Sequence, residues 1–360
     1  MAESEGAPPN PGKFMQIGMG YMASKVLLTA CDLDLFTILD NDGPSTGGAL
    51  AAKLGFGCRR PQDFFDALVA LGALERDGTG PEATYRNTVE SGLFLNRNKP
   101  DACVAGLLSM FNQRLYGFWD SLPEALRTDK PQNEIKTVGK SLFESIYHNE
   151  ADLETFSSGM SGVSAGPAMG LLGLPADVVD WSKVTTVLDI GGAQGKVAMM
   201  LANAHSHITG LSGDLPPLAP IVARAVAAFA ETTGNATLTD RVRHVDIDFF
   251  KDETLPAADL YTAGHILHDW GLEQKKAIIQ LVFNSLKSGG SFLAYDMMID
   301  AERRAAVPGL LLSLTMLIET PAGFDYSVTE VTAWFTEAGF VDVKTGALGG
   351  PHFYCVGTKP

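Results

Sequence analysis

Hydrophobic residues in the first part of the chain recur at helical spacing. From about residue 12 to 75 they follow helical faces, as in FMQIGMGYMASKVLLTACDLDLFTIL, and RRPQDFFDALVALGAL predicts a further helix. The segment LERDGTGPEATYRNT has two short strand-like runs around a glycine- and proline-rich turn, which predicts a hairpin. Helices followed by a hairpin indicate a winged-helix-like module, and a long helix is expected around 99–127.

The pattern changes after the polar linker RTDKPQNEIKTVGK. From about residue 183, short apolar runs alternate with helical stretches; the runs are TTVLDIG, HITGLSG, VRHVDI, ADLYTAG and GSFLAYD. This alternation predicts a mostly parallel sheet with helices on both faces. The chain closes with FVDVKTGAL and HFYCVGTKP, which are near enough to form an antiparallel hairpin at the sheet edge. The expected fold class is therefore α/β, with a Rossmann-like domain preceded by a mainly helical one.

Composition and charge exclude several classes of partner. The formal net charge of −15 repels phosphate backbones, so the winged-helix-like module is expected to dimerise rather than to bind nucleic acid. The N-terminal sequence lacks a secretory signal, and no apolar run is long enough to span a bilayer. The cysteines Cys31, Cys58, Cys103 and Cys355 form no CxxC pair, as is typical of reduced thiols. We therefore expect a cytoplasmic protein without a membrane partner.

A glycine-rich turn follows the first strand predicted in the C-terminal half. The segment TVLDIGGAQG (186–195) places Asp189 just before Gly191 and Gly192. Glycines let the backbone approach a ligand closely, and the acid can accept a hydrogen bond or pair with an ammonium group. GGAQG lacks the G-x-G-x-x-G spacing that a pyrophosphate needs. S-adenosylmethionine (SAM) has an amino group and no phosphate, so the turn favours SAM over a dinucleotide.

Acidic residues also end the next two predicted strands. Asp214, followed by Leu215 in GDLP, stands where an acid can accept hydrogen bonds from both ribose hydroxyls. The third strand ends in DIDFF, which places Asp248 and the backbone of Phe249 at the expected adenine position. Each aspartate taken singly is typical of a solvated turn. Three acids near successive strand ends predict a cofactor site instead.

A histidine follows the fourth predicted strand, in GHILHDWGLEQKK. His268 lies just past the carboxyl end of that strand, where ligands bind in open α/β sheets. An imidazole can take up a proton near neutral pH, and a carboxylate on its distal nitrogen stabilises the imidazolium. Asp296 in FLAYD and Asp325 in AGFDYS are the candidate carboxylates. No compact set of histidine, cysteine and carboxylate is visible, so no metal is predicted.

Together these motifs resemble the caffeate and acetylserotonin O-methyltransferase family, which joins a winged-helix dimerisation domain to a Rossmann-like SAM domain. The likeness extends from about residue 13 to near the end of the chain, and ILHDW between DFF and the strand-five acid is its most specific signature. Other matching segments are YRNT (85–88), FNQRLYGFW (111–119), LFESIYHNE (142–150), DFFKD, LPAADLY, RR (303–304) and SLTMLIET (313–320). The expected division is a tail at 1–11, a dimerisation domain at 12–128, a linker with cofactor-closing helices at 129–182 and a SAM domain at 183–360.

The resemblance implies roles for individual positions. His268 matches the general base of the family, and Asp296 and Asp325 match two glutamates that flank it. Contacts to SAM are implied for Gly191, Asp214, Asp248 and Phe249.

Further implied positions surround the cofactor and the acceptor. Tyr147 and Ser164 match residues that close over SAM, and His265 falls where relatives carry a basic residue. The segments that line the acceptor pocket contain Phe111, Asn112, Trp119, Phe156, Met160, Thr315 and Met316, for which plain core packing is an equal alternative.

The chain also departs from the family pattern. The usual GGGxG turn is GGAQG here, and Ile247 replaces a glycine before the acid of the third strand. Both glutamates beside the base are shortened to aspartates, so a looser or water-mediated contact with His268 is expected. Residues 324–326, Phe-Asp-Tyr, replace a more polar and charged stretch. The cofactor prediction survives these changes, whereas the acceptor does not transfer.

The leading hypothesis is a homodimeric SAM-dependent methyltransferase in which His268 deprotonates a hydroxyl of a small-molecule acceptor. The apolar stretch from Met15 to Leu39 exceeds what one module needs to bury, which predicts an obligate dimer, and Met15 or Tyr21 is a candidate for reaching the partner's pocket. The main alternative is a sulfur or nitrogen acceptor, including a small thioether acid on the way to dimethylsulfoniopropionate. A thioether needs no base, and Arg114 is the candidate partner for its carboxylate.

Two hypotheses from other classes also remain open on the sequence. One is a relative that binds SAM without methylating, and the other is a winged-helix regulator with a degenerate cofactor domain. The presence of His268 together with the strand-end aspartates weighs against the regulator.

Overall fold

The computed structural model describes residues 10–99, 102–139, 147 and 149–360. Contacts within the chain divide it into two compact units, Met1–Gln113 and Arg114–Pro360. The expected tail at 1–11 lies almost wholly outside the described residues. The division between units falls inside the helical stretch that follows the hairpin, earlier in the chain than the expected boundary at 128.

The N-terminal unit packs short helices against a small sheet, as the apolar periodicity predicts. Phe36, Phe65 and Tyr85 are buried at its centre, and the Tyr85 hydroxyl donates to Asp66 Oδ1 at 2.7 Å. The expected hairpin is confirmed, and a two-residue strand that the sequence does not indicate pairs beside it in the order β1-β3-β2. The elements are α1 (Gly12–Asp32), α2 (Leu35–Asp42), β1 (Ser45–Thr46), α3 (Gly47–Lys53), α4 (Gln62–Ala70), β2 (Leu74–Asp77), β3 (Thr84–Asn87), α5 (Val89–Phe94) and α6 (Ala105–Met110).

Helix α1 buries only its C-terminal half within its own unit. Leu28, Ala30 and Cys31 are buried there. Its N-terminal half instead exposes a run of large apolar side chains, Phe14, Met15, Ile17, Met19, Tyr21 and Met22. A stripe of this kind on a folded protein is typical of an interaction surface.

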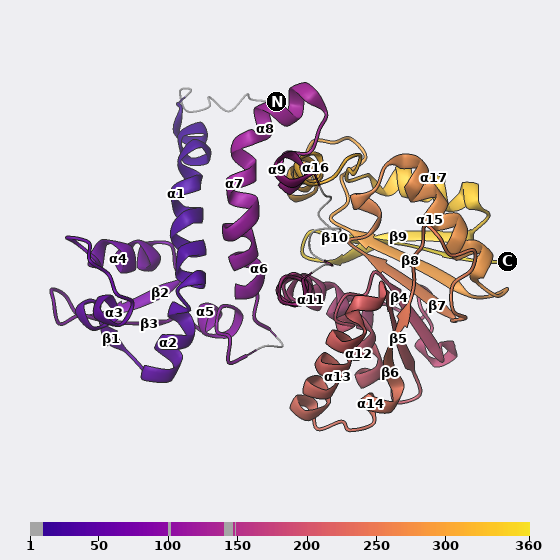
Figure 1. The fold of residues 1–360 in the computed structure, drawn as a ribbon, viewed down its shortest axis with the longest axis horizontal. Helices are drawn as coiled ribbons and strands as arrows, with labels where there is room; N and C mark the ends of the chain where they lie inside the picture. The colour runs from indigo at the N-terminus through magenta and orange to yellow at the C-terminus, as the bar shows by residue number, and fades with distance from the viewer. Residues whose placement is uncertain (1–9, 100–101, 140–146, 148) are drawn as a thin grey trace, which may run out of the picture. The chain divides into compact units, whose positions relative to one another are not determined.

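The C-terminal unit is built on a seven-stranded sheet of order β6-β5-β4-β7-β8-β10-β9 (Figure 1). The first five strands in this order are parallel, and β10 runs antiparallel to both β8 and β9, so the hairpin expected at the sheet edge is confirmed. The strands are β4 (Thr186–Ile190), β5 (Thr209–Asp214), β6 (Val242–Asp246), β7 (Leu260–Gly264), β8 (Ser291–Asp296), β9 (Val341–Gly349) and β10 (His352–Thr358).

Each face of this sheet carries its own apolar core. Val187 packs on one face with residues of α11 (Glu150–Leu172) and α12 (Lys196–Ala204). Its neighbour Leu188 packs on the other face with α15 (Leu272–Ser285) and α17 (Val328–Ala338). Successive strand residues point to opposite faces, so burial on both faces explains why these strands are uninterrupted apolar runs. The fold class expected from the sequence is confirmed.

The remaining helices of the C-terminal unit are α13 (Ala219–Thr233), α14 (Leu238–Arg241) and α16 (Val307–Glu319). The long helix expected at 99–127 is helical but irregular. Beyond α6 it continues as a π-helical turn at Phe111–Leu115, α7 (Tyr116–Phe118), a 3₁₀ turn at Trp119–Ser121 and α8 (Leu122–Thr128). The linker expected after it contains the short helix α9 (Glu134–Val138).

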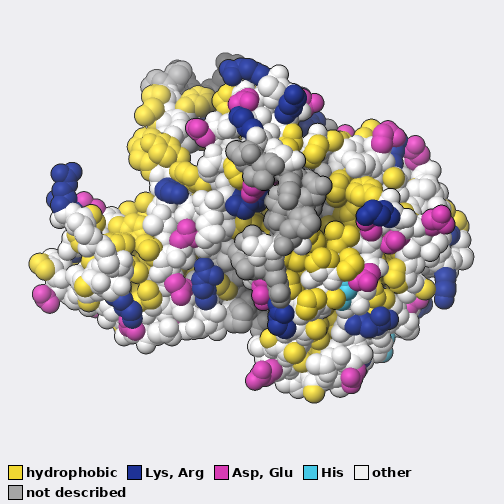
Figure 2. Space-filling view, in the orientation of Figure 1, with side chains coloured by type: hydrophobic (Ala, Val, Ile, Leu, Met, Phe, Trp, Pro, Cys, Tyr) yellow, Lys and Arg dark blue, Asp and Glu magenta, His cyan; other side chains and the backbone are white. Residues whose placement is uncertain are grey.

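Two surface properties agree with the charge and hydropathy patterns. Among the described residues on the face drawn in Figure 2, lysine and arginine side chains are scattered rather than gathered into one patch. Among the described helices, none combines the length and the apolar character required to cross a membrane.

Candidate active site

A cavity of about 260 Å³ lies within the C-terminal unit, at the carboxyl ends of the parallel strands. This is the position at which open α/β sheets bind ligands. Its walls come from Tyr147, from α11 and from the ends of β4 to β7 with the segments that follow them. The lining residues are Tyr147, Leu153, Phe156, Ser157, Met160, Ser164, Gly191, Ala193, Asp214, Leu215, Leu218, Ile247, Asp248, Phe249, Phe250, Gly264, His265, Ile266, Asp269 and Trp270.

The glycine-rich turn after β4 fits only residues without a Cβ. Gly191 lines the cavity with φ +68°, and a Cβ there would lie 2.1 Å from Ile266 Cδ1. A Cβ on Gly192 would lie 2.5 Å from Ser212 Oγ. The turn is tied to the neighbouring strand because the Gly191 N–H donates to the Gly213 carbonyl at 2.8 Å. Gly191 therefore lies in the cavity wall, whereas Gly192 is not among the described residues that line the cavity.

Asp189 does not take the place expected for it. It is buried near the end of β4 and accepts a hydrogen bond from Thr262 Oγ1 at 2.6 Å. Burial raises the pKa of this carboxyl to about 7, against the lowering effect of the Thr262 hydrogen bond. Among the described residues Asp189 is not one of those that line the cavity. A direct contact with the amino group of SAM is therefore not supported, and Asp189 holds the strands behind the turn instead.

Asp214 ends β5 and faces the cavity, as expected. Its Oδ1 accepts from the Tyr147 hydroxyl and from the Leu215 N–H, both at 2.8 Å, and its Oδ2 accepts from the Ala193 N–H at 3.1 Å. Burial raises the pKa of Asp214, while these donors lower it. Burial, followed by the Asp214 charge, raises the pKa of the Tyr147 phenol. Tyr147 and Asp214 thus lie side by side in the cavity wall.

The segment after β6 adds an acid and aromatic rings to the cavity wall. Asp248 and Phe249 line the cavity, and Asp248 Oδ2 pairs with Lys251 Nζ at 2.6 Å, which holds the pKa of the acid below its usual value. The Phe250 and Trp270 rings meet edge to face at 4.5 Å. Both rings belong to segments that match the family, DFFKD and ILHDW, but the sequence analysis named neither as a site residue. Together they form an aromatic wall suited to a flat base.

Ser164 and His265 both line the cavity, but neither offers what was expected. Ser164 Oγ donates to the Met160 carbonyl in its own helix at 2.9 Å. His265 has a left-handed backbone conformation with φ 56°, and its Nε2 is hydrogen-bonded to His352 Nε2 at 3.0 Å. Burial, followed by the charges of His268 and His352, lowers the pKa of His265 well below its usual value. The basic residue implied at this position is therefore a neutral imidazole here.

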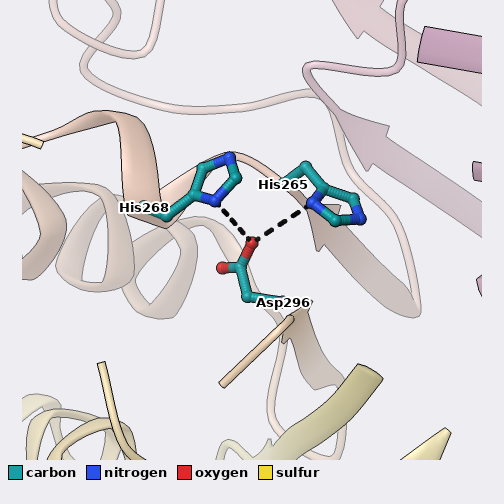
Figure 3. A group of neighbouring side chains, drawn as sticks. All are labelled: His265, His268 and Asp296. Carbon is teal, nitrogen blue, oxygen red and sulfur yellow. Dashed lines mark ion pairs between the residues drawn. The ribbon is translucent and has the colours of Figure 1, made fainter. Parts of the chain in front are cut away.

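His268 lies in the 3₁₀ turn Leu267–Asp269, which follows β7, and is buried beside the Asp296 carboxylate (Figure 3). Its Nδ1–H donates to Asp325 Oδ1 at 3.4 Å and lies 3.5 Å from Asp296 Oδ1. On the other side of the ring, Nε2 lies 3.6 Å from Asp269 Oδ1. Burial alone would lower the pKa of His268, but Asp296, Asp269 and Asp325 together raise it to about 10. Both shortened acids therefore reach the imidazole directly.

Asp296 occupies the centre of this group. It ends β8, is buried, and accepts a hydrogen bond from the Tyr326 hydroxyl on Oδ2, while burial raises its pKa to about 7. Its Oδ1 faces His268 Nδ1 and also His265 Nδ1, at 3.8 Å (Figure 3). Donor atoms of His265, His268 and Asp296 lie within 4.8 Å of one another. The sequence indicated no compact set of this kind, so that expectation is corrected. The contacts of His268 with Asp325 and of Asp296 with Tyr326 make the group part of a hydrogen-bond network.

The residues expected in the acceptor pocket do not all meet at this cavity. Phe156 and Met160 line it. Asn112 belongs to the N-terminal unit, where its Nδ2 donates to Asp32 Oδ2 at 2.6 Å. The other expected residues are placed away from the cavity wall: Phe111 in the N-terminal unit, Trp119 in a 3₁₀ turn, and Thr315 and Met316 buried on α16.

Arg114 is engaged by two glutamates. Its Nε and Nη2 donate to the two oxygens of Glu134 at 2.8 and 2.9 Å, and its Nη1 lies 3.2 Å from Glu319 Oε2. The carboxylate of Glu319 is almost fully buried. With two carboxylates already on the guanidinium, the role of Arg114 as partner for an acceptor carboxylate loses its support.

The fold and the site together define a class of protein. The parallel sheet ends in an antiparallel hairpin, a glycine turn and strand-end acids surround a cavity, and a buried histidine lies beside it. These features are typical of a SAM-dependent methyltransferase. The comparison with protein families gives the family. An "O-methyltransferase domain" model matches residues 119–341, and an "O-methyltransferase dimerisation domain" model matches residues 15–97. The chain belongs to this O-methyltransferase family and is a SAM-dependent enzyme that methylates small molecules.

Named relatives cover nearly the whole chain. The tetracenomycin polyketide synthesis 8-O-methyl transferase TcmO of Streptomyces glaucescens is 38% identical over 97% of this chain and 97% of its own length. A 3-hydroxy-5-methyl-1-naphthoate 3-O-methyltransferase of Streptomyces sahachiroi is 31% identical, with 96% and 95% covered. The crystal structure of human N-acetylserotonin methyltransferase in complex with SAM superposes with a TM-score of 0.86 at 26% identity, covering 98% of this chain and 99% of that one.

Proposed function

We propose that this enzyme methylates a phenolic hydroxyl on a fused aromatic small molecule, with His268 as the general base. The observation that carries the proposal is the burial of His268 among three carboxylates next to the cofactor cavity. The relatives support the acceptor class, because the printed names of two of them describe O-methylation in polyketide synthesis and on a hydroxynaphthoate.

The cavity residues fit SAM. Gly191, which accepts no Cβ, gives a ligand close approach to the backbone, and Asp214 presents a buried carboxylate of the kind that accepts from ribose hydroxyls. Phe249, Phe250 and Trp270 provide ring surface for the adenine. When bound, SAM supplies an electrophilic methyl group. The chain's own groups position the cofactor and exclude water around it.

The carboxylates determine which nitrogen of His268 works as the base. Asp325 and Asp296 face Nδ1, so this nitrogen carries the hydrogen, and Nε2, 3.6 Å from Asp269 Oδ1, receives the acceptor's proton. The charges of the same acids then stabilise the imidazolium. The same acids raise the pKa of His268 to about 10, so its neutral form is a stronger base toward a hydroxyl than a free imidazole.

The ion pairs of Arg114 also favour an oxygen acceptor over a thioether acid. A thioether acid would need a cation near its carboxylate, and the Arg114 guanidinium is already paired with Glu134 and Glu319. The apolar side chains of Phe156 and Met160 suit an aromatic acceptor.

We further propose that the enzyme works as a cytoplasmic homodimer. The exposed apolar half of α1 supports a second copy as the occupant of that surface, because the segment falls inside the match to the dimerisation domain. The four free cysteines are those of a protein in a reducing compartment. Light scattering at micromolar concentration tests the dimer: Ile17→Asp should give monomers, and a wild-type protein that is monomeric and fully active contradicts it.

The experiment for the proposed base uses a panel of phenols, naphthols, indoles, thioethers and amines with SAM, with S-adenosylhomocysteine as the readout. We expect turnover with hydroxylated aromatics. His268→Ala should then lower kcat by roughly 10²- to 10⁴-fold while calorimetric SAM affinity stays unchanged. A verified hydroxyl acceptor that His268→Ala methylates at the wild-type rate refutes the base. Turnover of thioethers alone refutes the acceptor class.

A further inference from the structure

Three buried side chains bring nitrogen and oxygen atoms together beside the cavity. Ring nitrogens of His265 and His268 and a carboxylate oxygen of Asp296 lie within 4.8 Å of one another (Figure 3). Nδ1 of His268 lies 3.5 Å from Asp296 Oδ1, and Nδ1 of His265 lies 3.8 Å from the same oxygen. Imidazole nitrogens combined with a carboxylate oxygen are a typical ligand set for zinc.

The separations of these atoms suit a zinc ion. Zinc–nitrogen bonds of about 2.0–2.1 Å and zinc–oxygen bonds of about 2.0–2.2 Å, at tetrahedral angles, place the ligand atoms roughly 3.3–3.6 Å apart. The contact of His268 Nδ1 with Asp296 Oδ1 already lies in this range, and the contact of His265 Nδ1 is slightly longer. Since the three atoms form one compact group, small rotations of the side chains are enough to complete three bonds.

Asp296 Oδ1 is a buried oxygen without a hydrogen bond. The residue is 1% exposed, and no hydrogen bond reaches Oδ1 from the described part of the chain, whereas Oδ2 accepts from the Tyr326 hydroxyl. Buried polar atoms of native proteins are almost always hydrogen-bonded, and a bound ion is one of the explanations for an exception. Oδ1 is also the oxygen that both histidines face, so the unpartnered atom stands at the centre of the candidate ligand set.

The surroundings of His265 prepare it as a ligand. Its Nε2 is hydrogen-bonded to His352 Nε2 at 3.0 Å, and its Nδ1 is too far from Asp296 Oδ1 to donate to it. This arrangement favours the hydrogen on Nε2 and a lone pair on Nδ1. A hydrogen-bond partner on the far nitrogen is the usual way in which proteins orient a ligating imidazole. Burial holds the pKa of His265 well below its usual value, so no proton competes for Nδ1 at neutral pH.

The charges around the group favour a divalent cation. Asp269, Asp296 and Asp325 surround His268, and Asp325 Oδ1 lies 3.4 Å from its Nδ1. The ammonium of the buried Lys275 faces the same acids and offsets one of their charges. With neutral imidazoles, three acids and one ammonium leave two negative charges, which a divalent cation balances.

A bound ion would change the state of His268. The ion must displace the hydrogen that Nδ1 carries, and because the acids raise the pKa of His268 to about 10, this competition weakens binding roughly 10²-fold at pH 8. One proton leaves as the ion binds. The hydrogen on Nε2 stays, because an imidazole bound through one nitrogen keeps its hydrogen on the other. Nε2 then has no lone pair for the acceptor's proton.

We propose that His265, His268 and Asp296 form a zinc site that switches the enzyme off, because the ion occupies Nδ1 of the base. The cavity, which His265 lines, gives the ion its entry and a water molecule as its fourth ligand. Mg²⁺ and Ca²⁺ prefer oxygen ligands and do not suit two imidazoles. The binding part of this inference stands on geometry alone, whereas the inhibitory part rests on His268 being the base.

The first test uses Co²⁺ as a spectroscopic probe in chelator-treated, full-length protein at pH 8. Four-coordinate Co²⁺ has much stronger visible absorption bands than the six-coordinate aqueous ion, so the spectrum reports the geometry of the site. We expect an equimolar amount of Co²⁺ to give strong bands at micromolar protein concentration. An equimolar amount of Zn²⁺ should abolish these bands, and millimolar Mg²⁺ should leave them unchanged.

The variant His265→Asn removes one ligand with a residue that tolerates the left-handed backbone. It should lose the strong bands and bind Zn²⁺ at least about 100-fold more weakly. His205→Asn is the matched control, since it removes a histidine that lies beside His207 and away from the cavity. We expect it to keep the wild-type spectrum.

Two results of the cobalt experiment overturn the site. One is weak bands in the wild type, or binding only at millimolar metal, which shows an adventitious ion only. The other is strong bands that folded His265→Asn retains. If His265→Asn does not fold, Asp296→Asn or His268→Ala takes its place as the variant without a ligand, and bands that either of them retains overturn the site equally.

Activity tests the inhibition. With a naphthol that the wild type methylates at pH 8, saturating Zn²⁺ should lower the rate by roughly 10²-fold or more, and a chelator should restore it. Each variant is compared with its own zinc-free rate. His205→Asn should be inhibited like the wild type, and His265→Asn should resist the same concentration of Zn²⁺.

The two experiments fail in different ways. Equal fractional inhibition of the wild type and His265→Asn overturns the switch. Strong cobalt bands with an undiminished rate in saturating Zn²⁺ also overturn it, and they contradict His268 as the base. Full activity of His268→Ala contradicts the base and leaves the cobalt spectrum to judge the zinc site alone.

Discussion

The replacement Asp296→Asn probes the electrostatics of the site most directly. It removes the charge that raises the pKa of His268 most, and it does so with an almost isosteric side chain. The amide oxygen can still accept the hydrogen bond from Tyr326, so the network loses a charge rather than a contact. The replacement therefore tests whether Asp296 sets the basicity of His268.

The size of the effect follows from the geometry. Asp296 Oδ1 lies 3.5 Å from His268 Nδ1. With an effective dielectric constant of about 20, two unit charges at this separation interact by about 5 kcal/mol. Since one pKa unit corresponds to about 1.4 kcal/mol, the charge accounts for roughly 3 units. We therefore expect the pKa of His268 to fall from about 10 to between about 7 and 8.

The assay is the pH dependence of kcat with a verified acceptor. In the wild type His268 is protonated across the neutral range, so kcat should rise about tenfold per pH unit from 7 to 9. In Asp296→Asn the rise of kcat should end about 2 to 3 pH units lower than in the wild type. The maximum kcat should also be smaller, because the base is weaker. Asp246→Asn is the matched control, since Asp246 pairs with His244 away from the cavity. Identical profiles for wild type and Asp296→Asn, with His268→Ala still inactive, would refute the reasoning.

Three further predictions concern the cofactor and the ion pairs. Asp214→Ala removes the acceptor of the Tyr147, Leu215 and ribose donors and should weaken SAM binding by about 1–3 kcal/mol in calorimetric titration; equal affinity contradicts the assignment. Gly191→Ala must adopt a φ of +68° and place its Cβ 2.1 Å from Ile266 Cδ1, so it should lose SAM binding, whereas Gly48→Ala, with nothing within 4 Å, should bind normally. Arg114→Met leaves Glu319 buried without its cation and should lower the free energy of unfolding by about 3–5 kcal/mol in denaturant titration; a raised acceptor KM with unchanged stability would instead restore a role in binding the acceptor.

The sheet was predictable because burial on both faces leaves a strong pattern. All five runs chosen from the sequence are strands, and the closing hairpin lies at the edge. Elements without such a pattern were missed. The strand β1 has two residues, and the π-helical turn at Phe111–Leu115 shows no interruption of apolar spacing that would mark it.

The site was predictable where side chains are fixed by their place at a strand end. Asp214 is the last residue of β5 and reaches the cavity, whereas Asp189 is followed by Ile190 in β4 and points to Thr262. A one-residue difference in a strand reverses the direction of the side chain, which spacing alone does not reveal. The burial of Lys275 was also beyond the pattern, since a lysine beside another lysine at the start of a helix is typical of a solvated face.

The electrostatics of the site bear on the acceptor without reference to any relative. A sulfur nucleophile attacks with its own lone pair, so a thioether acceptor would give no reason to place the half-buried Asp269 and the buried Asp296 and Asp325 around one imidazole. Such burial is costly unless the charges are paired, and Tyr326, Lys275 and the His268 imidazolium provide the pairing. What the arrangement produces is a base whose pKa the neighbouring acids raise to about 10, well above that of a free imidazole. A hydroxyl that must lose a proton is the acceptor that makes use of this base.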